Sequence, residues 1–170
     1  MTLIELMIGM AIIGILSAVV YYSLSRSLPE KHLKQAATQL YLDMQKAKSL
    51  AVLNRQRMRI DFNPVTQSYS MVDDQADTTL KTVSLSNYKS GITYGSGPAS
   101  RPYGTASTFG DDYITYDPDN SIVFEPNGMA NAGTVYLTNI NKSVCYALRT
   151  PMSTGNIKII KTGSETWPDE

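Results

Sequence analysis

The first 22 residues form one apolar run that contains a single charged side chain, Glu5. As a helix, this run would rise about 33 Å, which is enough to cross the hydrocarbon core of a bilayer. A carboxylate one turn inside such a segment costs about 3 kcal/mol or more, so it needs a partner and is a functional hypothesis in itself. The nearest positive charge is the α-amino group of Met1, from the same chain or from a neighbouring copy.

A signal peptide, a plain membrane anchor and a coiled-coil helix each fit this run less well. A secretory signal peptide needs a basic start, a shorter apolar stretch and a small-residue cleavage site, but no Lys or Arg precedes Arg26. A plain membrane anchor accounts for the hydrophobicity and leaves Glu5 unexplained. A coiled-coil helix would be apolar along one stripe, whereas this segment is apolar on all sides.

Composition limits what the rest of the chain can do. Beyond an anchor of about 25 residues, the 170-residue chain is long enough for one domain with its own core. The formal net charge of +0 gives no strong field toward nucleic acid. We expect His32 to be a solvated helix residue and Cys145 a small buried hydrophobe. With one His and one Cys on different elements, we expect neither an enzyme nor a cofactor.

A second helical pattern begins after Pro29. Apolar residues recur at spacings of three and four and predict an amphipathic helix over 30–53. The stripe consists of Leu33, Ala36, Ala37, Leu40, Met44, Ala47 and Ala51. Polar residues, Lys34 and Asp43 among them, lie mostly off this stripe. Because Pro29 lacks an amide proton, we expect a kink or break near residues 26–28.

Strand patterns recur at short spacing over 57–161. A hairpin is predicted over 57–72, because apolar and polar residues alternate over 57–62, a turn follows, and a second strand pattern covers 69–72. Further short strands are expected at 79–85, 92–94, 113–116, 122–124, 134–137, 144–148 and 157–160, with an exposed loop over 95–110. The sequence therefore predicts an α+β fold, in which a long N-terminal helix packs on an antiparallel β-sheet head. We assign residues 1–28 to a transmembrane or filament-core helix and 29–170 to the globular head.

Two short stretches carry a family resemblance, TLIEL at 2–6 and AIIGIL at 11–16. They resemble the start of a mature type IV pilin or type II secretion pseudopilin. Glu5 agrees with the family's invariant glutamate in its offset and in its flanking residues. Position 1 is usually Phe in that family, and Met1 is likewise large and apolar. Two alternatives stay open for Met1, a processed N-terminus or an initiator residue.

The resemblance implies a life cycle for the chain. A prepilin peptidase would remove a short basic leader before residue 1, and the new amine of Met1 would be methylated. The chain would first be a single-pass protein of the bacterial inner membrane with its head in the periplasm. An inner-membrane assembly platform would then place it in a periplasmic or cell-surface filament, beside further copies and other pilins or pseudopilins.

The head carries a narrower resemblance. The segment 40–62, IVFEPNG at 122–128 and GTVYL at 133–137 resemble the GspH/FimT type of pseudopilins and minor pilins. The resemblance implies a subunit of a type II secretion pseudopilus or of a pilus-like filament, used in protein secretion across the outer membrane. The alternative is a minor type IV pilin whose head binds DNA for uptake or serves adhesion. Asn156 departs from the pattern, because Arg is common at that place.

Glu5 and Met1 together suggest how such a subunit would assemble. In a filament, Glu5 can pair with the charged amine at residue 1 of the subunit already in place. One staggered register satisfies this pair, so we expect Glu5 to select the register more than to add stability. Gly9 and Gly14 are small and would let neighbouring helices approach closely.

Two weaker patterns remain. Asp111, Asp112, Asp117 and Asp119 are oxygen donors around one loop and form a candidate Ca²⁺ site. Their spacing is not that of an EF-hand, and an ordinary turn accounts for them as well, so we expect no metal. Basic residues concentrate over 26–59. We expect them to form a solvated face or to contact lipid headgroups, and nucleic acid is not an expected partner.

Overall fold

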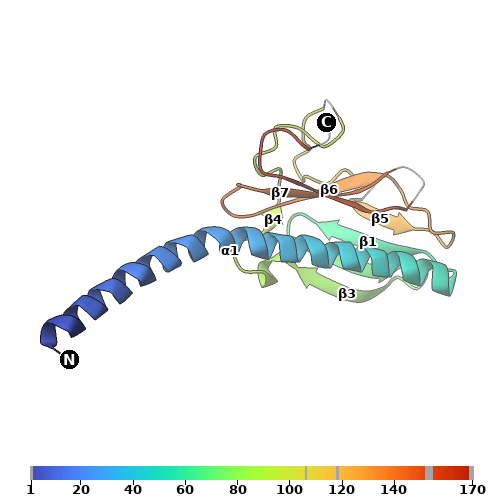
Figure 1. The fold of residues 1–170 in the computed structure, drawn as a ribbon. Helices are drawn as coiled ribbons and strands as arrows, with labels where there is room; N and C mark the ends of the chain where they lie inside the picture. Colours follow the sequence, from blue (N-terminus) through green and yellow to red (C-terminus); the bar gives the residue numbers. More distant parts are fainter. Residues whose placement is uncertain (1, 106, 118, 152–154, 169–170) are drawn as a thin grey trace.

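The computed structural model describes residues 2–105, 107–117, 119–151 and 155–168, with the side chains of 19–26 left out. A long helix, α1 (Leu3–Asn54), precedes a head made of strands (Figure 1). The strands are β1 (Met58–Asn63), β2 (Ser68–Asp73), β3 (Thr78–Ser84), β4 (Thr93–Tyr94), β5 (Ser121–Phe124), β6 (Gly133–Thr138), β7 (Cys145–Thr150) and β8 (Lys158–Thr162), with a short 3₁₀ helix, η1 (Leu85–Asn87), after β3. The predicted α+β class is confirmed.

Helix α1 runs through Pro29 without a break, so a break near 26–28, one of the two expected outcomes, is wrong, and a kink at Pro29 stays a prediction. A proline removes one backbone hydrogen bond of a helix, and bending relieves its clash with the preceding turn. Figure 1 shows α1 as a curved, continuous helix. It ends at Asn54. The capping residue Arg55 has a left-handed φ of 53°, and Gln56 N donates to Ala51 O at 3.2 Å.

The C-terminal half of α1 packs on the head through the predicted apolar stripe. All seven stripe residues are buried, none more than 1% exposed. Four of the seven are alanines, which leave room for strands to lie close to the helix. The helix contacts β1 and β5 on one side and β6 and β7 on the other.

The strands form two antiparallel four-stranded sheets rather than the single sheet expected. One sheet has the order β3-β2-β1-β5 and the other β4-β6-β7-β8. The predicted hairpin is confirmed, with Met58 opposite Asp73 and Asn63 opposite Ser68. The expected strand at 113–116 is reduced to one bridge between Ile114 and Val135.

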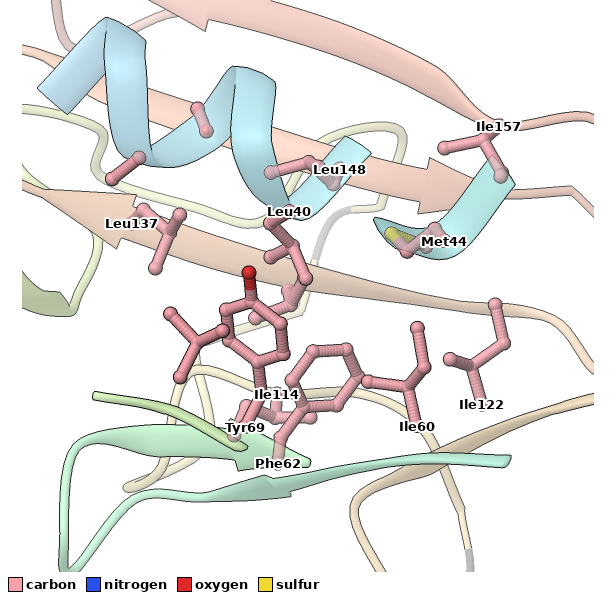
Figure 2. Packing of buried hydrophobic residues seen from close by; sticks show 14 of the residues in the cluster. Leu40, Met44, Ile60, Phe62, Tyr69, Ile114, Ile122, Leu137, Leu148 and Ile157 are labelled. Carbon is pink, nitrogen blue, oxygen red and sulfur yellow. The ribbon is translucent and has the colours of Figure 1, made fainter. Parts of the chain in front are cut away.

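The main core lies between α1 and the inner faces of both sheets (Figure 2). Its labelled members are Leu40 and Met44 from α1, Ile60 and Phe62 from β1, Tyr69 from β2, Ile114, Ile122 from β5, Leu137 from β6, Leu148 from β7, and Ile157. Burying apolar area of this kind is the main favourable term in folding. The core therefore fixes the position of α1 on the head.

The second sheet is buried on its outer face as well. A smaller cluster there joins Ala99, Tyr136, Cys145, Ala147 and Trp167. The loop 95–110, expected to be exposed, therefore lies partly in a core. Cys145 is confirmed as a small buried hydrophobe, and burial raises the pKa of its thiol.

A substitution at Gly133, the first residue of β6, tests how tightly the second sheet is packed. An added Cβ would lie 2.2 Å from Tyr116 Cδ1, and the buried Tyr116 ring cannot easily move because Thr150 Oγ1 lies 3.1 Å from its hydroxyl. We expect Gly133→Ala to lower the free energy of unfolding by about 1–3 kcal/mol, the usual cost of overpacking. Urea unfolding of the full chain measures the change. Gly163→Ala is the control, since its Cβ would meet only Ser143 O at 3.9 Å, and equal losses for both variants would contradict the prediction.

Three core tyrosines make stability sensitive to alkaline pH. Burial raises the pKa of Tyr69, Tyr94 and Tyr116 in the folded chain. Their stabilising contribution is complete below the unfolded pKa of about 10 and is lost as the pH rises above it, by about 1.4 kcal/mol per tyrosine per pH unit. We expect this decline in urea unfolding, with the tyrosinate absorbance of these three residues appearing only on unfolding. Tyr94→Phe should flatten the slope, and an unchanged slope would contradict this origin.

Candidate functional site

The N-terminal half of α1 extends beyond the head (Figure 1), and its described large apolar side chains are exposed. Ten large apolar residues there are 48–78% exposed: Leu3, Ile4, Leu6, Met7, Ile8, Met10, Ile12, Ile13, Ile15 and Leu16. We call this set the exposed stripe. A contiguous apolar surface of this kind marks a site of interaction with protein or membrane. Within the described residues, no helix combines the length and the hydropathy that crossing a bilayer requires.

Glu5 lies in the first turn of α1, on the same exposed half. Its Oε2 accepts a hydrogen bond from Thr2 N at 3.4 Å. The helix dipole favours a carboxylate at this end. Met1, the predicted partner, lies outside the described residues. The pairing of Glu5 with an amine of a neighbouring chain therefore stays a prediction.

The two glycines of this segment face open space. A Cβ at Gly9 or Gly14 would have no heavy atom within 4 Å. The surface at both positions is therefore free to receive another chain. Their role in close helix approach also stays a prediction.

Where the helix reaches the head, polar contacts attach it to β8 and to the turn before β4. Lys161 on β8 forms an ion pair with Glu30, next to Pro29. His32, expected to be solvated, is half-buried, and its Nδ1 lies 2.8 Å from Ser90 Oγ. These contacts fix the direction in which the exposed half of α1 leaves the head.

Asp43 is a buried polar residue that the sequence analysis placed on the polar side of its helix. It lies on the buried side of α1 and is 3% exposed. Tyr69 O–H donates to Asp43 Oδ2 at 2.7 Å, and Lys81 Nζ donates to its Oδ1 and Oδ2 at 2.7 and 2.6 Å. Asp43 follows Leu40 by three residues and precedes Ala47 by four, so its spacing was a signal for burial.

The four aspartates of the candidate calcium site do not come together as ligands. Among the described residues, no three His, Cys, Asp or Glu side chains lie close enough to hold a metal ion. Asp112 instead joins two parts of its loop. Its carboxylate accepts hydrogen bonds from Ile114 N at 3.2 Å and from Asn120 Nδ2 at 2.7 Å. Asp112 therefore stabilises the turn in this loop, and the expectation that Asp111, Asp112, Asp117 and Asp119 hold no metal stays a prediction.

The basic residues around the end of α1 are largely engaged with other groups. Arg57 pairs with Glu125 at 2.9 Å, and Arg59 pairs with three aspartates. Lys48 Nζ donates to Gly155 O at 2.8 Å. Charges neutralised in this way are poorly suited to binding phosphates. Among the described side chains, the paired charges of Arg57 and Arg59 therefore do not favour the DNA-binding alternative.

Comparison with known proteins gives two family matches. The family model described as type II transport protein GspH matches residues 36–154. A second model, the prokaryotic N-terminal methylation motif, matches residues 1–21. No curated protein matches the chain.

Two solved structures have a similar fold, both of the minor pseudopilin EpsH from the type 2 secretion system of Vibrio cholerae. Each has a TM-score of 0.54. One is 11% identical and is matched over 76% of this chain and 96% of that chain. The other is 13% identical and is matched over 82% of this chain and 98% of that chain. At these identities the likeness concerns the fold.

Proposed function

The chain belongs to the type II transport protein GspH family, and on this basis we propose that it is a minor pseudopilin which joins a secretion pseudopilus through the exposed half of α1. The family consists of structural subunits rather than enzymes. The exposed stripe is the observation that carries the proposal. Ten apolar side chains on one projecting helix need a cover of lipid or protein, and a bundle of equivalent helices supplies it.

Glu5 and Met1 set the register in this proposal. Before assembly, the segment 1–28 is held in the inner membrane with the head in the periplasm. On entry into the filament, Glu5 moves from a poorly solvated position to the amine of residue 1 on the preceding subunit. The pair recovers Coulomb energy in the apolar bundle, and one axial offset satisfies it.

Small residues let the bundle close. Gly9 and Gly14 present backbone rather than side chain to a neighbouring helix, which permits van der Waals contact at short range. The proposed partners are other pseudopilins and further copies of this chain. A prepilin peptidase and an inner-membrane assembly platform act before and during assembly.

Photo-crosslinking in cells tests this proposal. A photoreactive amino acid replaces Ile12 on the exposed stripe, or Leu80 on the head as the matched control, because both side chains are 52% exposed. We expect Ile12 to crosslink to another pseudopilin or to a second copy, and to lose that product when the other pseudopilins are deleted. Leu80 should give little product. Equal products from both positions, or none from Ile12, would contradict assembly through the stripe.

A further inference from the structure

We propose that the head binds a carboxylate group in a pocket centred on Arg149, a site separate from the exposed stripe. The pocket has a volume of about 400 Å³. It lies on the outer side of the second sheet, between loop residues such as Tyr103 and Thr108 and the strand residues Thr134 and Tyr136.

The charge of the pocket favours an anion. Arg149 is the only charged side chain among the described residues that line it. None of the ion pairs found among the described residues involves Arg149. Its positive charge therefore has no acidic partner among the described side chains, and a half-buried site strengthens its attraction for an anion compared with open water.

The Arg149 guanidinium is held in place by contacts that leave some of its N–H donors available. Arg149 Nη1 donates a long hydrogen bond of 3.4 Å to Tyr103 O, and Arg149 Cζ lies 5.4 Å from the Tyr103 ring centroid. Gly104, at φ +72°, lets the loop cross the guanidinium, because a Cβ there would lie 2.5 Å from Nη1. Within the described chain, no hydrogen bond occupies Arg149 Nε or Nη2. A planar fork of this kind matches the two oxygens of a carboxylate.

A hydroxyl group provides a second donor. Tyr136 OH accepts a hydrogen bond from Tyr103 N at 2.9 Å, and burial raises the pKa of Tyr136, so the phenol keeps its proton. That proton can be donated to an anion beside Arg149. Pro102, Tyr103 and Pro151 supply apolar walls that suit the carbon atoms next to a carboxylate. The matching ligand is a polypeptide carboxylate, from either a chain end or an acidic side chain.

The chain contains its own reporter for this pocket. Trp167 is the only tryptophan. Its ring lies 5.8 Å from Tyr103 and 5.7 Å from Tyr136, centroid to centroid, and both tyrosines line the pocket. A ligand that moves either ring will change the environment of Trp167 and hence its fluorescence.

The experiment is a fluorescence titration of the full chain in detergent micelles. The probes are acetyl-Gly-Gly with a free carboxylate, acetyl-Glu-amide, the neutral acetyl-Gln-amide and inorganic phosphate. We expect a saturable change with at least one carboxylate probe and none with acetyl-Gln-amide. Tighter binding of acetyl-Gly-Gly would identify a chain end as the source, and tighter binding of acetyl-Glu-amide an acidic side chain.

Variants assign the binding to Arg149. Arg149→Gln should weaken it at least tenfold, and Arg149→Lys, which keeps the charge and loses the fork, should also weaken it. Arg57→Gln, the same charge change at the Glu125 pair, should leave it unchanged. Circular dichroism checks that each variant is folded. Absence of any saturable change, equal affinity in folded Arg149→Gln, or tighter binding of phosphate than of either carboxylate would overturn the proposal.

Discussion

Replacing Glu5 with Leu is expected to reduce incorporation into the filament by about 100-fold or more, while the head stays folded. In the proposed bundle, the change leaves the amine of residue 1 on the neighbouring subunit buried without a partner. Breaking a buried ion pair from one side costs about 3–5 kcal/mol, and each 1.4 kcal/mol is about a tenfold change in an equilibrium constant. The yield of this chain in sheared filaments, relative to the total in cells, measures the loss.

The variant Glu5→Gln distinguishes the effect of the Glu5 charge from the effect of its hydrogen bond in the first turn of α1. Gln keeps an oxygen that can accept the hydrogen bond from Thr2 N, so the first turn of α1 should be unchanged. We expect Glu5→Gln to fail in assembly as Glu5→Leu does. Glu165→Leu, the same change at an exposed position of the tail, is the matched control and should assemble normally. Wild-type incorporation of Glu5→Leu would contradict the pairing role.

Replacing Asp43 with Leu is expected to lower the free energy of unfolding of the head by about 2–3 kcal/mol. The change removes the acceptor of the buried Tyr69 hydroxyl, and an unsatisfied buried polar group costs about 1–3 kcal/mol. Lys81 adds less, because its side chain is 38% exposed and can turn to solvent. Urea unfolding of the full chain, followed by circular dichroism, measures the change.

A second substitution tests whether the loss comes from that hydroxyl. Tyr69→Phe removes the hydroxyl that Asp43→Leu leaves without an acceptor. The double variant Asp43→Leu/Tyr69→Phe should therefore lose less stability than the sum of the two single variants. Asp111→Leu is the surface control, since Asp111 is exposed and its backbone is not left-handed, and it should change stability by less than about 0.5 kcal/mol. Additive losses in the double variant would mean that Asp43 acts through some other contact.

Local patterns predicted most of the elements of this fold. The stripe from Leu33 to Ala51 repeats at helical spacing, and each member is buried where the spacing places it. The hairpin of β1 and β2 is encoded within 16 residues by alternation and a turn. Helical and strand periods involve neighbouring residues only, so a single sequence reveals them.

Contacts between distant segments were not predictable in the same way. The division into two sheets depends on β5 pairing with β1, and on β4 pairing with β6 across a long loop. Trp167 lies in the largely polar segment 162–170, yet it is buried and donates to Arg101 O at 2.8 Å. The order of the strands and the position of the C-terminal segment depend on how much apolar surface the whole chain buries. The spacing of residues along the sequence does not reveal this.

The sequence alone determined the N-terminal helix with its single carboxylate at Glu5, the amphipathic helix and the β-rich head, because apolar periodicity and an isolated charge are visible along the chain. The tertiary structure decided which polar groups became buried, because that depends on partners far away in sequence. Asp43 became a core residue because Tyr69 and Lys81 meet it there. Arg149 lines a pocket because a loop far away in sequence crosses its guanidinium at Gly104.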